Sequence, residues 1–154
     1  KESEIVLSKI DSINNKSFMV LGDFNSHSPF DGNPGLDNPD LLKNVRVSDL
    51  KSKDYNNLLD EEFDYSVMAS FMAYPLIDVT QRFVKTQDRF TYPAKVHLGN
   101  YNSLQDFEKS QRRIDFIMVS RELAKKCVNS TVYNGEETAM LSDHYPVMAE
   151  FKLD

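Results

Sequence analysis

The feature that most constrains the fold is the stretch FMVLGDFN at residues 18–25. Its run of apolar residues, with aromatic and β-branched members, predicts a short central strand that is buried on both faces. Gly22 permits a sharp exit from this strand. Asp23 and Asn25 are therefore expected at the carboxyl end of a central strand, which is where layered α/β folds bind their ligands.

Asp23 and Asn25 also have a simpler interpretation. Asp and Asn side chains bond to nearby backbone groups and tolerate unusual dihedral angles, so the two residues would also suit an Asx turn that closes the strand. Taken alone, the stretch favours neither interpretation. Two later motifs favour the first.

The composition fits one globular domain and argues against several classes of partner and site. The chain has 154 residues with 40% hydrophobic content, which is enough for one core. A net charge of −6 and a pI of about 5.1 argue against a broad basic surface for nucleic acid, although a single groove can still be basic. Cys127 is the only cysteine, which excludes an internal disulfide and a cysteine zinc site. No apolar run is long enough to cross a bilayer, and the compartment stays open, with secretion or a periplasmic location as alternatives.

Hydrophobic periodicity and turn residues divide the chain into short elements. The expected order is a helix at 1–14, a strand at 18–21, a polar loop at 26–40, a helix with an acidic first turn at 60–62 that Pro75 ends, short strands at 76–79 and 90–93, a polar loop at 99–110, a strand at 113–119, a helix at 120–126 capped by Ser120, an outer strand at 127–133, a turn at 134–135 and a half-buried strand at 147–153. This order predicts an α/β (α+β) fold.

Asp115 interrupts the otherwise apolar strand at 113–119. A buried carboxylate loses favourable hydration unless another group pairs with it. We expect its partner to be His144, which would donate one ring N–H to Asp115 and turn its other nitrogen toward a substrate. The alternatives are an ion pair of Asp115 with Arg112 or Arg113, and a histidine that is simply satisfied at a sheet edge.

Asp143 stands directly beside His144, ahead of the last strand. An Asp-His step in this position places a hard oxygen ligand and an imidazole at one strand end. A magnesium-assisted phosphoryl site requires both groups.

Three motifs, GDFN at 22–25, RIDFI at 113–117 and SDHYPV at 142–147, resemble in the same order the last three motifs of the endonuclease/exonuclease/phosphatase family. One given tetrapeptide is expected by chance at roughly one position in 10⁵, so three ordered motifs are not accidental. The family includes pancreatic-type deoxyribonucleases, abasic-site endonucleases, neutral sphingomyelinases, inositol-polyphosphate 5-phosphatases and poly(A) deadenylases. The motifs specify the family more closely than the member.

The resemblance implies a hydrolase that cleaves a phosphate ester or phosphodiester with an activated water and a divalent metal, Mg²⁺ or alternatively Mn²⁺. Asp23 would orient or deprotonate the water, and Asn25 would bond a phosphoryl oxygen and help to hold Asp23. Asp115 would orient His144, which would contact the scissile phosphate. Asp143, with Asp23, would bind the metal.

The resemblance also implies that part of the domain is absent. Family members are four-layer αββα sandwiches whose first half supplies an Asn and the Glu that is the principal metal ligand. No such pattern precedes Gly22, so residues 1–154 are expected to be the C-terminal half of a single domain, with mostly antiparallel or mixed strands flanked by helices. A lone half would expose one apolar sheet face. We expect the missing N-terminal half, or self-association, to cover that face.

The substrate stays open among a lipid, a sugar, another small phosphodiester, and DNA or RNA in a locally basic groove. A catalytically silent binding module of the same fold is the alternative from another class. Tyr92 is expected to contact the substrate, with ordinary packing as its alternative. Arg112 and Arg113 would steer an anionic substrate or form ion pairs.

The remaining histidines and the cysteine have less specific expectations. His27 follows Asn25 closely and would either contact a leaving group or, as we expect, be solvated in its loop. His97 and Cys127 are expected to be structural.

Overall fold

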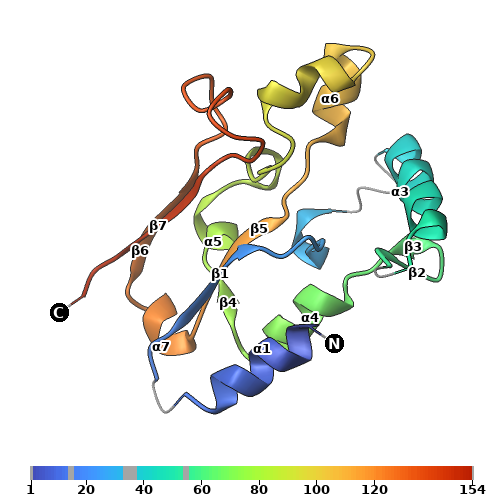
Figure 1. Ribbon diagram of the computed structural model, residues 1–154. Helices are drawn as coiled ribbons and strands as arrows, with labels where there is room; N and C mark the ends of the chain where they lie inside the picture. The colour runs from blue at the N-terminus through green and yellow to red at the C-terminus, as the bar shows by residue number, and fades with distance from the viewer. Residues whose placement is uncertain (1, 14–15, 33–37, 54–55, 154) are drawn as a thin grey trace.

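The structure is a computed structural model that describes residues 2–13, 16–32, 38–53 and 56–153. It is a mixed α/β fold, and every strand pairing among these residues is antiparallel (Figure 1). This arrangement confirms the predicted fold class. Among the described helices, none combines the length and the apolar character that crossing a membrane would require.

The elements are short and alternate in type along the chain. The helices are α1 (Glu2–Asp11), α3 (Pro39–Lys51), α4 (Ser66–Ala73), α5 (Thr80–Phe83), α6 (Leu104–Ser110) and α7 (Arg121–Ala124), with 3-10 helices η1 (Pro29–Asp31), η2 (Thr86–Asp88) and η3 (Lys95–Asn100). The strands are β1 (Met19–Asp23), β2 (Leu58–Leu59), β3 (Glu62–Phe63), β4 (Ile77–Asp78), β5 (Asp115–Val119), β6 (Cys127–Val132) and β7 (Val147–Phe151). One sheet has the order β1-β5-β4, and β2–β3 and β6–β7 form two-stranded sheets.

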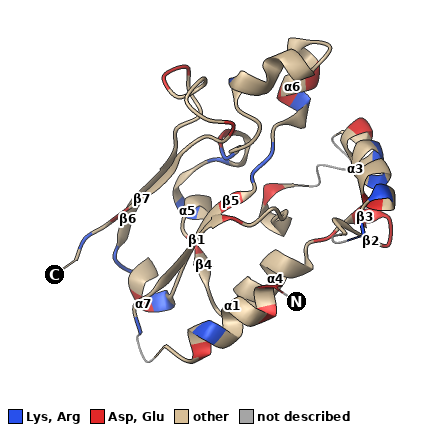
Figure 2. Cartoon of the chain, viewed as in Figure 1, with Lys and Arg blue, Asp and Glu red and all other residues tan. Residues whose placement is uncertain are grey.

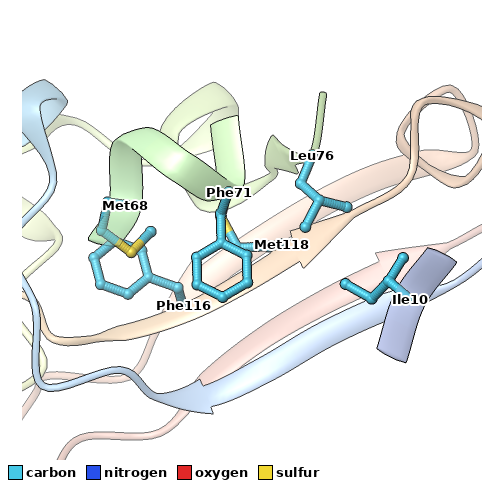
Figure 3. Packing of buried hydrophobic residues seen from close by; sticks show 6 residues of the cluster. All are labelled: Ile10, Met68, Phe71, Leu76, Phe116 and Met118. Carbon is cyan, nitrogen blue, oxygen red and sulfur yellow. The ribbon is translucent and has the colours of Figure 1, made fainter. Parts of the chain in front are cut away.

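β5 is the centre of the three-stranded sheet, and its side chains alternate between two cores. Phe116 and Met118 point to the first core, where they meet Met68 and Phe71 of α4 (Figure 3). α1 adds Ile10 to the same cluster. The helices α1 and α4 therefore cover one face of the sheet.

The second core lies on the opposite face of β5. Ile117 and Val119 pack there with Leu123 of α7 and Cys127 of β6. Ser120 caps α7 as predicted, because its side chain accepts a hydrogen bond from the backbone N–H of Leu123. β7 packs against this cluster, which places the start of the β6–β7 sheet beside β5.

β1 is not the doubly buried central strand that the sequence predicts. Among the described residues it pairs only with β5, and Met19 and Leu21 are 45% and 60% exposed. Val20 packs against the first core from the other face. A run of apolar residues indicates that both faces of a strand can be buried, but not which elements cover them. The prediction is thus wrong for β1 in this chain, whereas β5 is buried on both faces.

The acidic residues at 60–62 do not begin a helix. Asp60 and Glu61 form the turn between β2 and β3, with φ angles of 50° and 67°. Two successive residues with positive φ suit a tight hairpin turn, and this pairing overrides the preference of acidic side chains for a helix N-terminus. α4 begins only at Ser66, and it ends before Pro75 as predicted.

Other boundaries also differ from the predicted ones. Part of the predicted loop at 26–40 belongs to α3, whose first turn is capped by Asn38, while residues 33–37 lie outside the described residues. The predicted loop at 99–110 contains α6, which Ser103 caps. Both helices begin at a residue whose side chain caps the first turn, and this local hydrogen bond favours a helix although the surrounding sequence is polar. The predicted strand at 90–93 is a single bridge between Tyr92 and Arg112. α1 and α7 end at Asp11 and Ala124, earlier than predicted, and residue 14 is not described.

Candidate active site

Asp23 and Asp115 lie opposite each other on β1 and β5. They are Cα partners in the antiparallel register, which places their side chains on the same face of the sheet. β1 ends at Asp23 and β5 begins at Asp115, so both carboxylates lie at the same end of the sheet. Two of the three sequence motifs therefore meet in space.

The third motif joins them through His144. Its Nδ1 lies 2.8 Å from Oδ2 of Asp115. Since a carboxylate can only accept, Nδ1–H is the donor, and Nε2 is left as the second functional nitrogen. No described residue bonds to Nε2, and the side chain is 25% exposed. The predicted Asp115–His144 contact is confirmed.

The alternative ion pair of Asp115 with an arginine is absent from the described part of the chain. Arg113 is buried and instead lies 2.7 Å from a carboxylate oxygen of Asp31 and 2.7 Å from one of Asp78. Asp31 also pairs with Arg89 at 3.1 Å. Arg113 therefore anchors the 29–31 turn and β4 to the start of β5, which confirms for this residue the ion pairing that was expected as the alternative to steering a substrate.

Asp23 is held by the residue two positions later. Oδ1 accepts the backbone N–H of Asn25 at 2.7 Å, and Oδ2 accepts its side-chain amide at 2.9 Å. This is the geometry of an Asx turn, and Asn25 has a positive φ of 46°. The simpler interpretation of the motif is therefore correct at the level of local geometry. The same two bonds fix the direction of the Asp23 carboxylate.

Thr91 connects the parts of the site, and sequence reasoning missed it. Its Oγ1 accepts the backbone N–H groups of Ile114 and Asp115 at 3.1 and 3.2 Å. Its carbonyl oxygen accepts the N–H of Tyr145, the residue after His144, at 2.8 Å. A fully buried threonine thus ties the Asp115 strand to the His144 loop. The polar residue between Phe90 and Tyr92 in the sequence was the available sign of this role.

Tyr92 lies against the ring of His144, with 4.8 Å between the ring centroids. Tyr92 also contacts Arg112, whose guanidinium carbon lies 4.7 Å from the Tyr92 ring centroid. His97 also approaches Tyr92, at 5.9 Å between centroids. The structure places Tyr92 beside the site, as predicted, while its contact with a substrate stays a prediction.

Asp143 is exposed and directly precedes His144 in the chain. Its carboxylate accepts a hydrogen bond from Ser142, and this bond lowers the pKa of Asp143 below its usual value. Its backbone oxygen accepts the N–H of Ala94, which fixes the loop. An exposed, ionised carboxylate next to His144 is chemically suited to a divalent cation.

His27 differs from the other site histidine because it is largely enclosed. Its ring lies 4.3 Å from that of Phe63, and burial, together with the nearby Arg112 cation, lowers the pKa of His27 to about 4. The imidazole is therefore neutral near pH 7. The expectation that His27 is solvated in its loop is wrong.

No protein-family model matches the chain, and no curated protein matches it. Its fold, however, is found in solved structures. The chain has the fold of about half of a Neisseria enzyme. The matching structures include the 3′ phosphatase NExo from Neisseria bound to a product DNA hairpin, at 18% identity, and the 3′-5′ exonuclease NExo from Neisseria meningitidis, at 20% identity. Each has a TM-score of 0.61 and covers 99% of this chain and 51% of its own.

At this identity the likeness shows the fold alone. The coverage agrees with the prediction of half of a sandwich, since nearly the whole chain aligns with half of the longer one. The resemblance that the motifs carry is thus supported at the level of fold.

Proposed function

We propose that this chain carries part of the active site of a hydrolase that cleaves a phosphate ester or phosphodiester with a water activated next to a divalent metal. The observation that carries the proposal is the meeting of the Asp115–His144 pair with the Asn25-held Asp23 at one end of β1 and β5. Two carboxylates, an amide and an imidazole at a partly open strand end suit an in-line attack on phosphorus.

Each group has a chemical role in this proposal. Asp23, whose direction is fixed by Asn25, orients or deprotonates the attacking water. Asp115 holds His144 in the tautomer that presents Nε2 to the scissile phosphate. A protonated His144 would donate to a non-bridging oxygen and stabilise the charge that develops there. Asn25 would bond another phosphoryl oxygen.

The metal is proposed on the chemistry of the donors. The described residues contain no group of three His, Cys, Asp or Glu side chains placed to hold an ion. Mg²⁺, however, is commonly bound by one or two carboxylates together with waters and substrate phosphates, and Asp23 and Asp143 supply hard oxygens of this kind. Mn²⁺ accepts the same donors. When bound, the metal would neutralise charge on the phosphate, and a further carboxylate from an N-terminal half of the domain would complete its site.

Nuclease activity is the second candidate. The Neisseria enzyme of the same fold is a 3′ phosphatase and 3′-5′ exonuclease, and one of its structures holds product DNA. This likeness favours a nucleic-acid phosphoester among the substrates predicted from sequence. A binding module without activity is disfavoured, because it has no need of an oriented imidazole with a free nitrogen.

The test is turnover by the full-length protein of bis-p-nitrophenyl phosphate, plasmid DNA and sphingomyelin, each with and without Mg²⁺. We expect magnesium-dependent hydrolysis of at least one of them. Metal binding is measured separately by isothermal titration with Mg²⁺ and Mn²⁺, with Asp143→Asn as the variant that weakens it. Absence of turnover on every phosphoester would overturn the proposal and favour the binding module.

A further inference from the structure

Arg112 occupies a junction next to the proposed site. It lines a cavity of about 610 Å³ between α3, η3 and α6, together with Tyr92 and Tyr101. It also lines a cavity of about 510 Å³ that contains Asn25. The two cavities share Val45, and we call them together the α3 groove. The groove is therefore lined by Asn25 in one part and by Tyr92 and Tyr101 in the other, and Arg112 lines both parts.

The guanidinium of Arg112 is held in place by uncharged groups, and the Asp23 carboxylate acts on it electrostatically without forming an ion pair. Its Nη1 donates to the carbonyl oxygen of Ser110 at 3.1 Å, and its guanidinium carbon lies over the Tyr92 ring, 4.7 Å from the centroid. Its backbone is bridged to Tyr92. None of the carboxylates in the described ranges forms an ion pair with it.

The neighbouring arginines show how this fold treats a buried guanidinium that serves structure alone. Arg113 has two carboxylate partners, Asp31 and Asp78. Arg89 pairs with Asp31 and also donates to backbone carbonyl groups. Arg112, in contrast, is only partly buried, forms no ion pair within the described ranges, and keeps its remaining donors accessible to solvent. Arg112 thus has the donors free for an anion from outside the chain.

The surroundings of Arg112 suit a phosphate. Lys43 of α3 and Lys109 of α6 line the same cavity as Arg112, and Asp40 and Asp106 line it too, so basic side chains outnumber acidic ones there by one. Acidic and basic residues are mixed over both helices (Figure 2). Tyr92 links Arg112 to His144 through ring contacts of 4.7 and 4.8 Å. An anion bound by Arg112 would therefore be separated only by the Tyr92 ring from the phosphate that His144 is proposed to contact. Arg is the residue that best matches phosphate oxygens with paired donors.

We infer that Arg112 binds a second phosphate group of the substrate, in the α3 groove beside the scissile phosphate. The inference rests on the proposed function and adds to it that the preferred substrates carry at least two phosphates. Such a group can come from a nucleotide or from a phosphorylated sugar headgroup, and the two sources share the same contact with Arg112.

The experiment compares substrates that differ only in the second phosphate, using the full-length protein. One pair is a thymidine dinucleotide with and without a 5′-terminal phosphate, and the other is glycerophosphoinositol with and without a 4-phosphate. We expect the added phosphate to raise kcat/KM by about tenfold to a hundredfold in at least one pair, because charge-assisted hydrogen bonds are of this strength. The pair that responds identifies the source.

The variants assign the preference to this residue. Arg112→Gln is expected to bring the ratio of kcat/KM values within each pair close to one, and Arg112→Lys to leave an intermediate ratio, since it keeps charge but loses the paired donors. Arg121→Gln, the same exchange on α7, serves as the matched control and is expected to keep the ratio. The ratio is insensitive to general damage, because both substrates of a pair meet the same enzyme.

A binding measurement separates this inference from the proposed function. Inorganic pyrophosphate is titrated into ¹⁵N-arginine-labelled protein, and the Arg112 side-chain signal is assigned by its loss in Arg112→Gln. A shift of that signal supports the anion site even if no phosphoester is hydrolysed, in which case only the proposed function fails. An unshifted signal, or a preference that survives in Arg112→Gln, would overturn the inference.

Discussion

β1 and β5 are paired strands that carry equivalent site residues, yet their surroundings differ sharply. Leu21 and Ile117 are Cα partners, and their exposed fractions are 60% and 8%. β5 lies between two cores, while β1 is covered on one face only within the described part of the chain. The two carboxylates of the site thus lie on strands that are buried to very different extents.

The difference shows two ways to orient a catalytic carboxylate. Asp115 is oriented by tertiary structure, through the buried strand, the Thr91 hydroxyl and the His144 ring. Asp23 is oriented by a local turn with Asn25, which does not depend on burial of β1. The Asp23 carboxylate can therefore keep its orientation even when one face of β1 is exposed.

Substitution of the Cα partners Leu21 and Ile117 by alanine tests the comparison directly and is expected to give the largest effect on stability. Ile117→Ala is expected to lower the free energy of unfolding by about 2–5 kcal/mol, because it removes buried carbon atoms from a packed core. Leu21→Ala, which removes the same number of carbon atoms, is expected to cost less than about 1 kcal/mol in the 154-residue chain. Urea unfolding followed by circular dichroism measures both values.

The same pair tests whether another part of the protein covers β1. In the full-length protein, the cost of Leu21→Ala is expected to rise toward that of Ile117→Ala if an N-terminal half packs on β1. Size-exclusion chromatography of the 154-residue chain shows whether self-association covers the strand instead. Equal and small costs for Leu21→Ala in a monomeric chain and in the full-length protein would contradict the half-domain prediction.

A smaller effect is the pH dependence of stability that comes from His27, which follows β1 and lines the α3 groove. Folding lowers the pKa of His27 from 6.5 to about 4, so the unfolded chain binds this proton more readily than the folded chain. The free energy of unfolding is therefore unaffected by His27 above pH 6.5 and decreases as the pH falls from 6.5 toward 4. The loss is at most about 3 kcal/mol at 1.36 kcal/mol per pKa unit. His27→Gln is expected to flatten the pH dependence of the unfolding free energy in this window, and an unchanged slope would contradict the burial of His27.

Much of the site was predictable because its residues stand out locally. Asp115 interrupts an apolar strand and needs a partner, and His144 was the correct one. The cover of β1 was not predictable, since the sequence of a strand does not record which face its neighbours occupy. Thr91 and Arg112 were missed or only partly recognised because their roles arise from contacts with distant residues, and no local pattern carries them.

The central claim is that Asp115 and His144 act as one unit on a single phosphorus atom. Its most direct test is a double-mutant cycle of Asp115→Asn, His144→Ala and the double variant in the full-length protein, with kcat/KM for the best phosphoester substrate as the readout. We expect His144→Ala to lower kcat/KM by about 10²–10⁴ and the double variant to be no slower than the slower single variant. Multiplying losses, or an unchanged rate in His144→Ala, would contradict the account.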